Sequence, residues 1–188
     1  EKTLKLTGAN KATLLKTLRA VIGTLDPTLQ NVSLSKDLKD TFIIRRGDTE
    51  IIIQEGKLLN REVLSSGTAE GIDVAMFLAA MKAKENSFYY CDEHFSYIQS
   101  DIEKRIFGIM LDRLGENEQL IFTTHNTDML DLNLPKHSYV FLRKRLEDGA
   151  YKVSAISASD VLKRNTDSVR NAVENDVFAS LPQDSLLD

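Results

Sequence analysis

The sequence predicts an α/β fold in which a mostly parallel sheet is flanked by helices and extended by β-hairpins. Two apolar runs, Ser87 to Cys91 and Gln119 to Thr124, lack alternation, which is typical of strands buried on both faces of a parallel sheet. The helical pattern from Ile102 to Leu114 lies between them. Strand, helix and strand therefore form a unit whose crossover makes the two strands parallel.

The other expected elements follow from periodicity and turn residues. Alternating apolar runs on either side of Gly47-Asp48 and of Glu147-Asp148-Gly149 predict two hairpins. Apolar residues at helical spacing predict the helices, the first of which ends at Gly23 and Pro27. In chain order, we expect a helix over 14–22, strands over 41–46 and 50–54, a helix over 68–84, strands over 138–143 and 151–156, and helices over 160–164 and 168–178.

Composition excludes several classes of protein. The 188 residues are 42% hydrophobic and 28% charged, which is ordinary for a globular domain with its own core. No apolar run reaches the roughly 18 residues of a membrane span, and no signal peptide opens the chain. The lack of such a run predicts no membrane partner. A lone cysteine, Cys91, excludes an internal disulfide framework and favours a cytoplasmic location. The net charge of −4 predicts no strong grip on nucleic acid by this segment alone.

A carboxylate pair, Asp92 and Glu93, follows the first apolar strand. The carboxyl end of such a strand is where open α/β sheets bind ligands. In nucleotide hydrolases an aspartate at this place holds Mg²⁺ directly or through water, and a neighbouring glutamate orients the attacking water. The alternative is an acidic pair that opens a helix and is stabilised by the helix dipole.

A histidine, His125, follows the second apolar strand within Thr123-Thr124-His125-Asn126. If the two strands are neighbours, His125 lies beside the carboxylate pair. Its imidazole could then donate a hydrogen bond to a terminal phosphate oxygen. The alternative is a strand-end histidine whose polar atoms are satisfied by a turn.

Small polar residues, Leu64-Ser65-Ser66-Gly67-Thr68, precede the helix expected from Thr68. Backbone N–H groups, hydroxyls and the helix dipole together make an anion site at a helix N-terminus. The alternative is an ordinary N-cap formed by Ser66 or Thr68. An N-cap needs only one such residue, and here several come together.

The order and spacing of these segments resemble those of ABC-type ATPase heads. The Ser-Ser-Gly helix start comes about 25 residues before the Asp-Glu pair, and His125 follows about 32 residues after it. Leu64 to Thr68 looks like the signature motif, Phe88 to Glu93 looks like Walker B with its catalytic glutamate, and His125 looks like the switch histidine. The Ser-Ser-Gly-Thr and Thr-Thr-His-Asn forms resemble the SMC- and RecF-like branch, especially bacterial AAA ATPases of the overcoming-lysogenization and abortive-infection kind.

This resemblance implies an ATP- and Mg²⁺-dependent ATPase that works as a pair of heads. In it, Asp92 would hold Mg²⁺, Glu93 would position the attacking water and His125 would contact the γ-phosphate. The residues that would bind the ATP held by a partner head are Leu64, Ser65, Ser66, Gly67 and Thr68. The expected partner is a second ATPase head or a missing N-terminal half, and DNA or an effector protein is a further candidate, as in DNA repair or phage defence.

The resemblance covers roughly Val63 to Ile156 and divides the chain into three expected regions. They are an N-terminal helix and β-hairpin region over 1–60, a core with the signature, Walker B and switch histidine over 61–157, and a C-terminal helical tail over 158–188.

Two departures from the family pattern narrow this interpretation. The Walker A pattern G-x-x-x-x-G-K-[ST] is absent, and Gly8 to Thr13, which lacks the second glycine, is interpreted as a loop before a helix. The chain is therefore expected to be the C-terminal lobe of a P-loop ABC-type head, inactive in hydrolysis by itself, with Walker A upstream. In the D-loop, Gln99 stands where family members often carry aspartate, and Asp101 lies two positions further on.

Three alternatives stay open at this point. The head could be a non-hydrolysing dimerisation or regulatory module that controls a nuclease or defence effector. It could be a nuclease of the overcoming-lysogenization kind, although the region after Ile156 lacks a clustered Asp-x-Asp. It could also be an unrelated α/β fold in which the motifs occur by chance.

Overall fold

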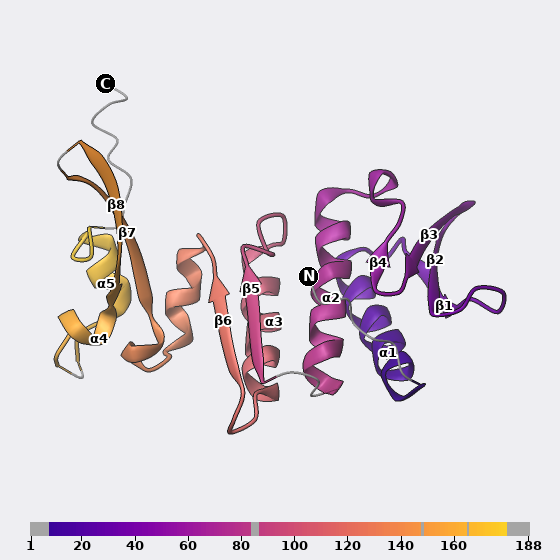
Figure 1. The fold of residues 1–188 in the computed structure, drawn as a ribbon, viewed down its shortest axis with the longest axis horizontal. Helices are drawn as coiled ribbons and strands as arrows, with labels where there is room; N and C mark the ends of the chain where they lie inside the picture. The colour runs from indigo at the N-terminus through magenta and orange to yellow at the C-terminus, as the bar shows by residue number, and fades with distance from the viewer. Residues whose placement is uncertain (1–7, 84–86, 148, 165, 180–188) are drawn as a thin grey trace. The chain divides into compact units, whose positions relative to one another are not determined.

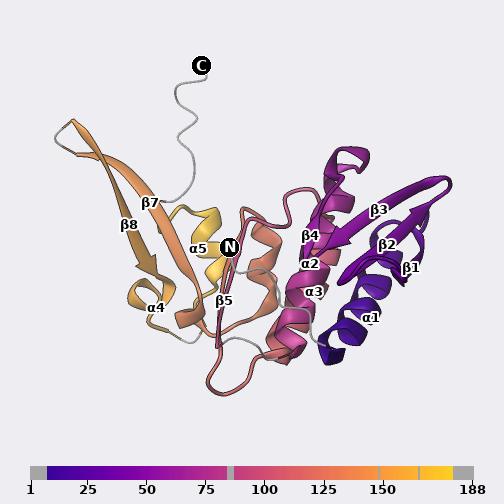
Figure 2. The ribbon, with the colours of Figure 1, turned by 45° about the vertical axis from the view of Figure 1, so that its right-hand side comes forward.

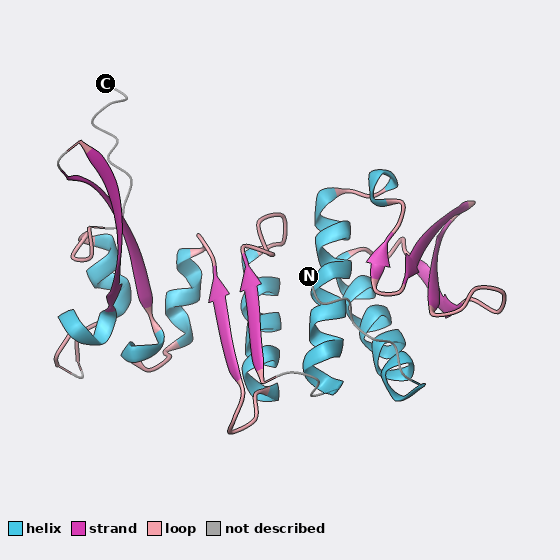
Figure 3. Cartoon of the chain, viewed as in Figure 1, coloured by secondary structure: helices cyan, strands magenta, loops and turns pink. Residues whose placement is uncertain are grey.

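The computed structural model describes residues 8–83, 87–147, 149–164 and 166–179 of the chain. They belong to two compact units, Glu1–His125 and Asn126–Asp188, each built from helices and strands (Figures 1 and 3). Among the described residues, no helix has the length and apolar character needed to cross a membrane.

The first unit opens with a long helix and an antiparallel sheet. The elements are α1 (Gly8–Leu25), β1 (Gln30–Leu34), β2 (Thr41–Arg46), β3 (Thr49–Gln54) and β4 (Lys57–Leu58), with the strands in the order β1-β2-β3-β4. The predicted first helix is confirmed, although it continues through Gly23 to Leu25 and ends before Pro27. The hairpin of β2 and β3 is also confirmed, and Gly47 supplies the left-handed φ of 56° at its turn. The loop predicted over Gly8 to Thr13 is wrong, because these residues form the first turns of α1.

Helix α2 (Ser66–Ala83) is buried on two sides. Ile72 and Ala75 join the core that α1 forms with the β1–β4 sheet, whereas Val74 and Leu78 join the core under the next strands. Such a double burial requires apolar side chains on more than one face of the helix. Helices α1 and α2 lie side by side (Figure 2), and a Cβ at Gly71 would lie 2.2 Å from Leu25 Cδ1, so the Leu25 side chain would have to move to admit one.

The rest of the first unit is the predicted strand–helix–strand unit. It consists of β5 (Phe88–Asp92), α3 (Ser100–Arg113) and β6 (Gln119–Thr123). β5 and β6 pair in parallel from Phe88↔Gln119 to Asp92↔Thr123, as the sequence predicts.

Two expectations about the sheet are corrected. A mostly parallel sheet is not found, because among the described residues parallel pairing is confined to β5 and β6. The short turn between β2 and β3 leaves only antiparallel pairing open to that hairpin. Burial of β5 on both faces is also wrong: Tyr89 and Cys91 are buried against α2 and α3, while Phe88 and Tyr90 are each 52% exposed on the other face.

The second unit is a hairpin packed on short helices. Its elements are η2 (Thr127–Leu132), η3 (Lys136–Ser138), β7 (Val140–Glu147), β8 (Ala150–Ser157), α4 (Ala158–Val161) and α5 (Val169–Glu174). Its core centres on Phe178, whose ring stacks on Phe141 with centroids 4.1 Å apart. The hairpin is confirmed, but both tail helices are shorter than predicted, since Leu162 and Asn175 leave helical geometry.

We expect Phe42→Ala to lower the free energy of unfolding of this chain by about 3–5 kcal/mol, because Phe42 is fully buried in the core beneath the β1–β4 sheet. Urea unfolding measures the change. Leu34 is the matched control: it faces Phe42 in the strand register but is 39% exposed, so Leu34→Ala should cost only about 1 kcal/mol. Equal losses in the two variants would contradict this placement of the core.

Candidate functional site

The carboxylate pair lies where β5 ends. Asp92 is the last residue of the strand, and Glu93 follows it with a left-handed φ of 49°. A non-glycine residue in this region is uncommon and carries a conformational cost that recurs at functional sites. Both side chains are exposed, so the strand delivers two carboxylates to solvent at the carboxyl edge of the parallel pair.

Thr123, at the end of β6, fixes both acidic residues. Its hydroxyl donates to Asp92 Oδ1 at 2.6 Å and accepts the Glu93 backbone N–H at 3.1 Å, while its carbonyl oxygen lies 3.2 Å from the same nitrogen. This role was not predicted for Thr123. The signal lies in its position, because a hydroxyl at the end of the neighbouring parallel strand directly faces the aspartate.

His125 reaches the other carboxylate. Its Nε2 lies 2.8 Å from Glu93 Oε1, and the two side chains are 86% and 51% exposed. The structure thus brings the predicted glutamate and histidine into direct contact, and the partner of the histidine is this carboxylate rather than a turn. An exposed Glu–His pair beside a second carboxylate can accept, hold and return a proton.

The Leu64–Thr68 segment forms the start of α2 with a specific set of contacts. The Ser65 hydroxyl accepts the Thr68 N–H at 3.2 Å and lies 2.8 Å from Thr68 Oγ1, so Ser65 is the N-cap. The alternative of an ordinary N-cap thus holds for Ser65, and not for Ser66 or Thr68. Ser66 is exposed in the first turn and Gly67 is half-buried, whereas Leu64 packs against the core.

The segment after Glu93 leads to α3. Phe95 is buried, and its ring lies 5.3 Å from that of Phe122. Gln99 has extended backbone at the N-cap of α3 without a capping side-chain bond, and Asp101 in the first turn pairs with Lys104 at 3.4 Å. Within the part of the chain that the structure describes, no hydrogen bond or ion pair joins Gln99 or Asp101 to Asp92 or Glu93.

Two further groups near β5 and β6 were not predicted as part of the site. Glu103, on α3, is 2% exposed, and its carboxylate accepts the Thr124 hydroxyl at 2.8 Å. That bond holds the chain just before His125 against the helix. Cys91 is buried in the core, and this burial raises the pKa of its thiol to about 12, so it does not serve as a nucleophile.

A metal ion at this site would depend on few protein ligands. No group of three or more His, Cys, Asp or Glu side chains that could hold a metal occurs within the described ranges. Mg²⁺ in nucleotide sites commonly takes one or two carboxylates and completes its shell with phosphate oxygens and water. Asp92, oriented by Thr123 and exposed, fits the part of such a carboxylate.

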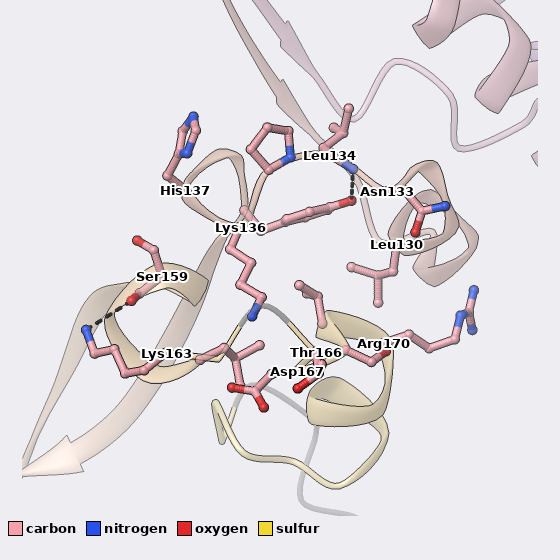
Figure 4. A pocket seen from close by; sticks show the side chains of 15 residues that line it. Leu130, Asn133, Leu134, Lys136, His137, Ser159, Lys163, Thr166, Asp167 and Arg170 are labelled. Carbon is pink, nitrogen blue, oxygen red and sulfur yellow. Dashed lines mark hydrogen bonds between the residues drawn. The ribbon is translucent and has the colours of Figure 1, made fainter.

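A separate open depression lies in the second unit (Figure 4). Its lining includes Lys136 and Lys163, whose ammonium groups donate to the backbone carbonyls of Arg164 and Ser159. Tyr139 also lines it and accepts the Leu134 N–H at 3.2 Å. The Lys136 contact joins η3 to the segment after α4, and none of the predicted site residues lines this depression.

Comparison with known proteins gives a fold but no family. No family model matches the sequence, and no curated protein matches it. Among solved structures, 38 chains match. One is an SMC head bound to the C-winged helix domain of ScpA, with a TM-score of 0.51 and 16% identity over 80% of this chain and 45% of that chain. Another comes from work on ATP-driven dimerization and DNA-stimulated activation of SMC ATPases, with a TM-score of 0.51 and 16% identity over 92% of this chain and 94% of that chain.

At this level of identity the likeness concerns the fold alone, which is similar to that of SMC ATPase heads. The chain spans less than half of the length of the ScpA-bound head. The α/β character and the parallel pair β5–β6 agree with such a fold.

We expect Thr123→Val to speed hydrogen exchange of the Glu93 amide by about fivefold, because losing one hydrogen bond of about 1 kcal/mol weakens its protection. Exchange measured by NMR on this chain tests the change. Thr123→Ser keeps the hydroxyl and should leave the rate nearly unaltered. A Glu93 amide that exchanges equally in both variants would show that the hydroxyl does not hold this backbone.

Proposed function

We propose that this chain is part of an SMC-like ATPase and supplies the metal-binding, water-activating and signature residues of an ATP site completed by a partner. The observation that carries the proposal is the meeting of Glu93 with His125 at 2.8 Å, beside an Asp92 held by Thr123. All four residues lie at the carboxyl ends of two adjacent parallel strands, where α/β folds bind ligands.

In this proposal Asp92 and Glu93 divide the work of hydrolysis. Asp92 contributes a ligand to Mg²⁺, which when bound neutralises charge on the phosphates. Glu93 orients the attacking water and accepts its proton. The left-handed backbone of Glu93 is fixed by two contacts with Thr123, and its carboxylate is half-exposed beside His125, where the γ-phosphate would lie.

In the same proposal, His125 moves from Glu93 to the γ-phosphate when ATP binds. In the structure its Nε2 lies 2.8 Å from Glu93 Oε1, so the imidazole occupies one side of that carboxylate. Donation to a γ-phosphate oxygen would therefore release the Glu93 carboxylate to bind water. Because the His125 side chain is 86% exposed, it can turn toward a nucleotide without disturbing the core.

The turn that begins α2 is proposed to bind the ATP of a partner head. Ser66 and Gly67 bring backbone N–H groups to the start of an 18-residue helix, and Ser65 adds a hydroxyl that caps it. The fold likeness to SMC ATPases, one of them described by ATP-driven dimerization, supports this assignment.

A phosphate-binding loop must come from elsewhere in this proposal. No Walker A pattern occurs in the sequence, and Gly8 to Thr13, the segment with a glycine, a lysine and a threonine, lies in α1. We therefore propose a partner segment that carries Walker A, and a cytoplasmic protein whose ATP cycle acts on DNA or an effector.

We expect Glu93→Gln in the complete protein to lower kcat for ATP about 100-fold or more, because it removes the general base while keeping the shape of the side chain. The ATP-bound dimer should persist. Turnover assays and size-exclusion chromatography with ATP measure both effects.

Glu116→Gln is the control, since Glu116 is an exposed glutamate in the turn before β6. Unchanged turnover in Glu93→Gln would sink the assignment of the base. ATP-dependent dimerisation of the unaltered protein without turnover would instead support the regulatory module that does not hydrolyse ATP.

We expect Ser66→Arg to weaken ATP-dependent dimerisation at least about tenfold, because a bulky side chain at the exposed first turn of α2 would exclude the partner's phosphates. ATP binding by a single head should be unaffected. Analytical ultracentrifugation with ATP measures dimerisation, and Ser154→Arg, on the exposed β8, is the control. Normal dimerisation of Ser66→Arg would remove α2 from the proposed interface.

A further inference from the structure

A buried carboxylate on α2 has no part in the site described so far. Glu70 is 6% exposed, although glutamate is rarely buried without a partner. Its Oε2 accepts the backbone N–H of Tyr97 at 2.9 Å. Burial raises the pKa of Glu70, and hydrogen bonds from the backbone N–H groups of Tyr97 and Ser96 oppose that rise. The carboxylate therefore binds the backbone of the loop after β5 instead of facing solvent.

The same α2 turns make a second contact with this loop. A Cβ at Gly67 would lie 3.0 Å from the Tyr97 carbonyl oxygen, so the absence of a side chain lets the loop approach the helix. The Tyr97 ring does not anchor the loop, since the side chain is 70% exposed. Gly67 and Glu70 thus both contact the main chain of Tyr97. Gly67 lies close to its carbonyl oxygen, and Glu70 accepts a hydrogen bond from its N–H.

The held residue connects back to Glu93 over a short path. The Ser96 hydroxyl donates to the Glu93 carbonyl oxygen at 3.0 Å. Phe95, between them, is buried in the core with Phe122, and the Ile98 N–H closes a turn onto the Phe95 carbonyl at 3.2 Å. Segment 93–98 is therefore a compact turn, and Glu70 links it to α2 through the Tyr97 N–H.

We propose that Glu70 is a positioning residue that fixes the backbone of Glu93 by fastening the turn 93–98 to the first turns of α2. The inference rests on the proposed function, in which Glu93 activates water and Ser65 to Gly67 contact the ATP of a partner head. Glu70 stands three positions after Gly67, the last residue of that segment. In this proposal the start of α2 contacts the ATP of the partner head, and Glu93 acts on a different ATP. Glu70 would hold these two parts of the chain in a fixed relation.

The test compares three substitutions in the complete protein. Glu70→Ala removes the acceptor, Glu70→Gln keeps a carbonyl oxygen that can accept the Tyr97 N–H, and Asp73→Ala is the control. Asp73 lies on the same helix and pairs with Arg61 at 2.8 Å. Amide exchange at Tyr97 reports the contact, and steady-state kinetics report its use.

Glu70→Ala should speed Tyr97 exchange about tenfold or more and lower kcat for ATP at least about tenfold, with KM changed less than about twofold, because water positioning rather than ATP binding is impaired. Glu70→Gln should restore kcat to within about threefold of the unaltered protein, as expected if the acceptor matters more than the charge. Asp73→Ala should change neither readout.

Several results would overturn the proposal. They are wild-type kcat in Glu70→Ala, a Tyr97 amide whose exchange does not change, and a Glu70→Gln variant as impaired as Glu70→Ala. If Glu70→Ala fails to fold, Ser96→Ala breaks the same path at the exposed Ser96 hydroxyl and should lower kcat about threefold without affecting KM; an unchanged kcat there also overturns it. If the complete protein does not hydrolyse ATP, the proposed function is contradicted instead. The exchange rate of the Tyr97 amide in Glu70→Ala then tests by itself whether Glu70 holds the turn 93–98.

Discussion

The parallel pairing of β5 with β6 is the constraint on which the candidate site depends. Its register sets Asp92 opposite Thr123, so that a hydroxyl from one strand orients the carboxylate of the other and holds the backbone of Glu93. Two residues further on, the same register brings His125 to Glu93. A shift of one residue would turn every side chain of a strand to the opposite face and separate these groups. The positions of the candidate site residues relative to one another therefore depend on the register of β5 and β6.

Helix α2 connects the β5–β6 pair to the rest of the first unit. It is buried against α1 and the β1–β4 sheet on one side and against β5 and α3 on the other, so its orientation is fixed by two hydrophobic cores. Its first turns carry the serine-glycine segment, and Glu70 fastens them to the turn after β5. Burial gives the helix its position, and the partly buried hydrogen bond from the Tyr97 N–H to Glu70 links the helix to the turn after β5.

Much of this arrangement could be predicted from the sequence because it depends on local pattern. The apolar runs that became β5 and β6, with a helical period between them, predict parallel neighbours and hence the meeting of Glu93 and His125. The exposure of Phe88 and Tyr90 could not be predicted, since an apolar run does not show which of its faces the rest of the chain covers. The Glu70 contact was equally hidden, because its partner is a main-chain N–H, which leaves no trace in the identity of Tyr97.

The central claim is that a nucleotide-bound metal sits at the ends of β5 and β6, and paramagnetic NMR of the complete protein with Mn²⁺ and a non-hydrolysable ATP analogue tests it most directly. Mn²⁺ replaces Mg²⁺ at oxygen-rich sites and broadens the signals of nearby amides. The account predicts that the amides of Asp92, Glu93, Thr123 and His125 broaden together, while those of β2 and β3 stay sharp. Broadening that spares these four residues, or that centres on another part of the chain, would contradict it.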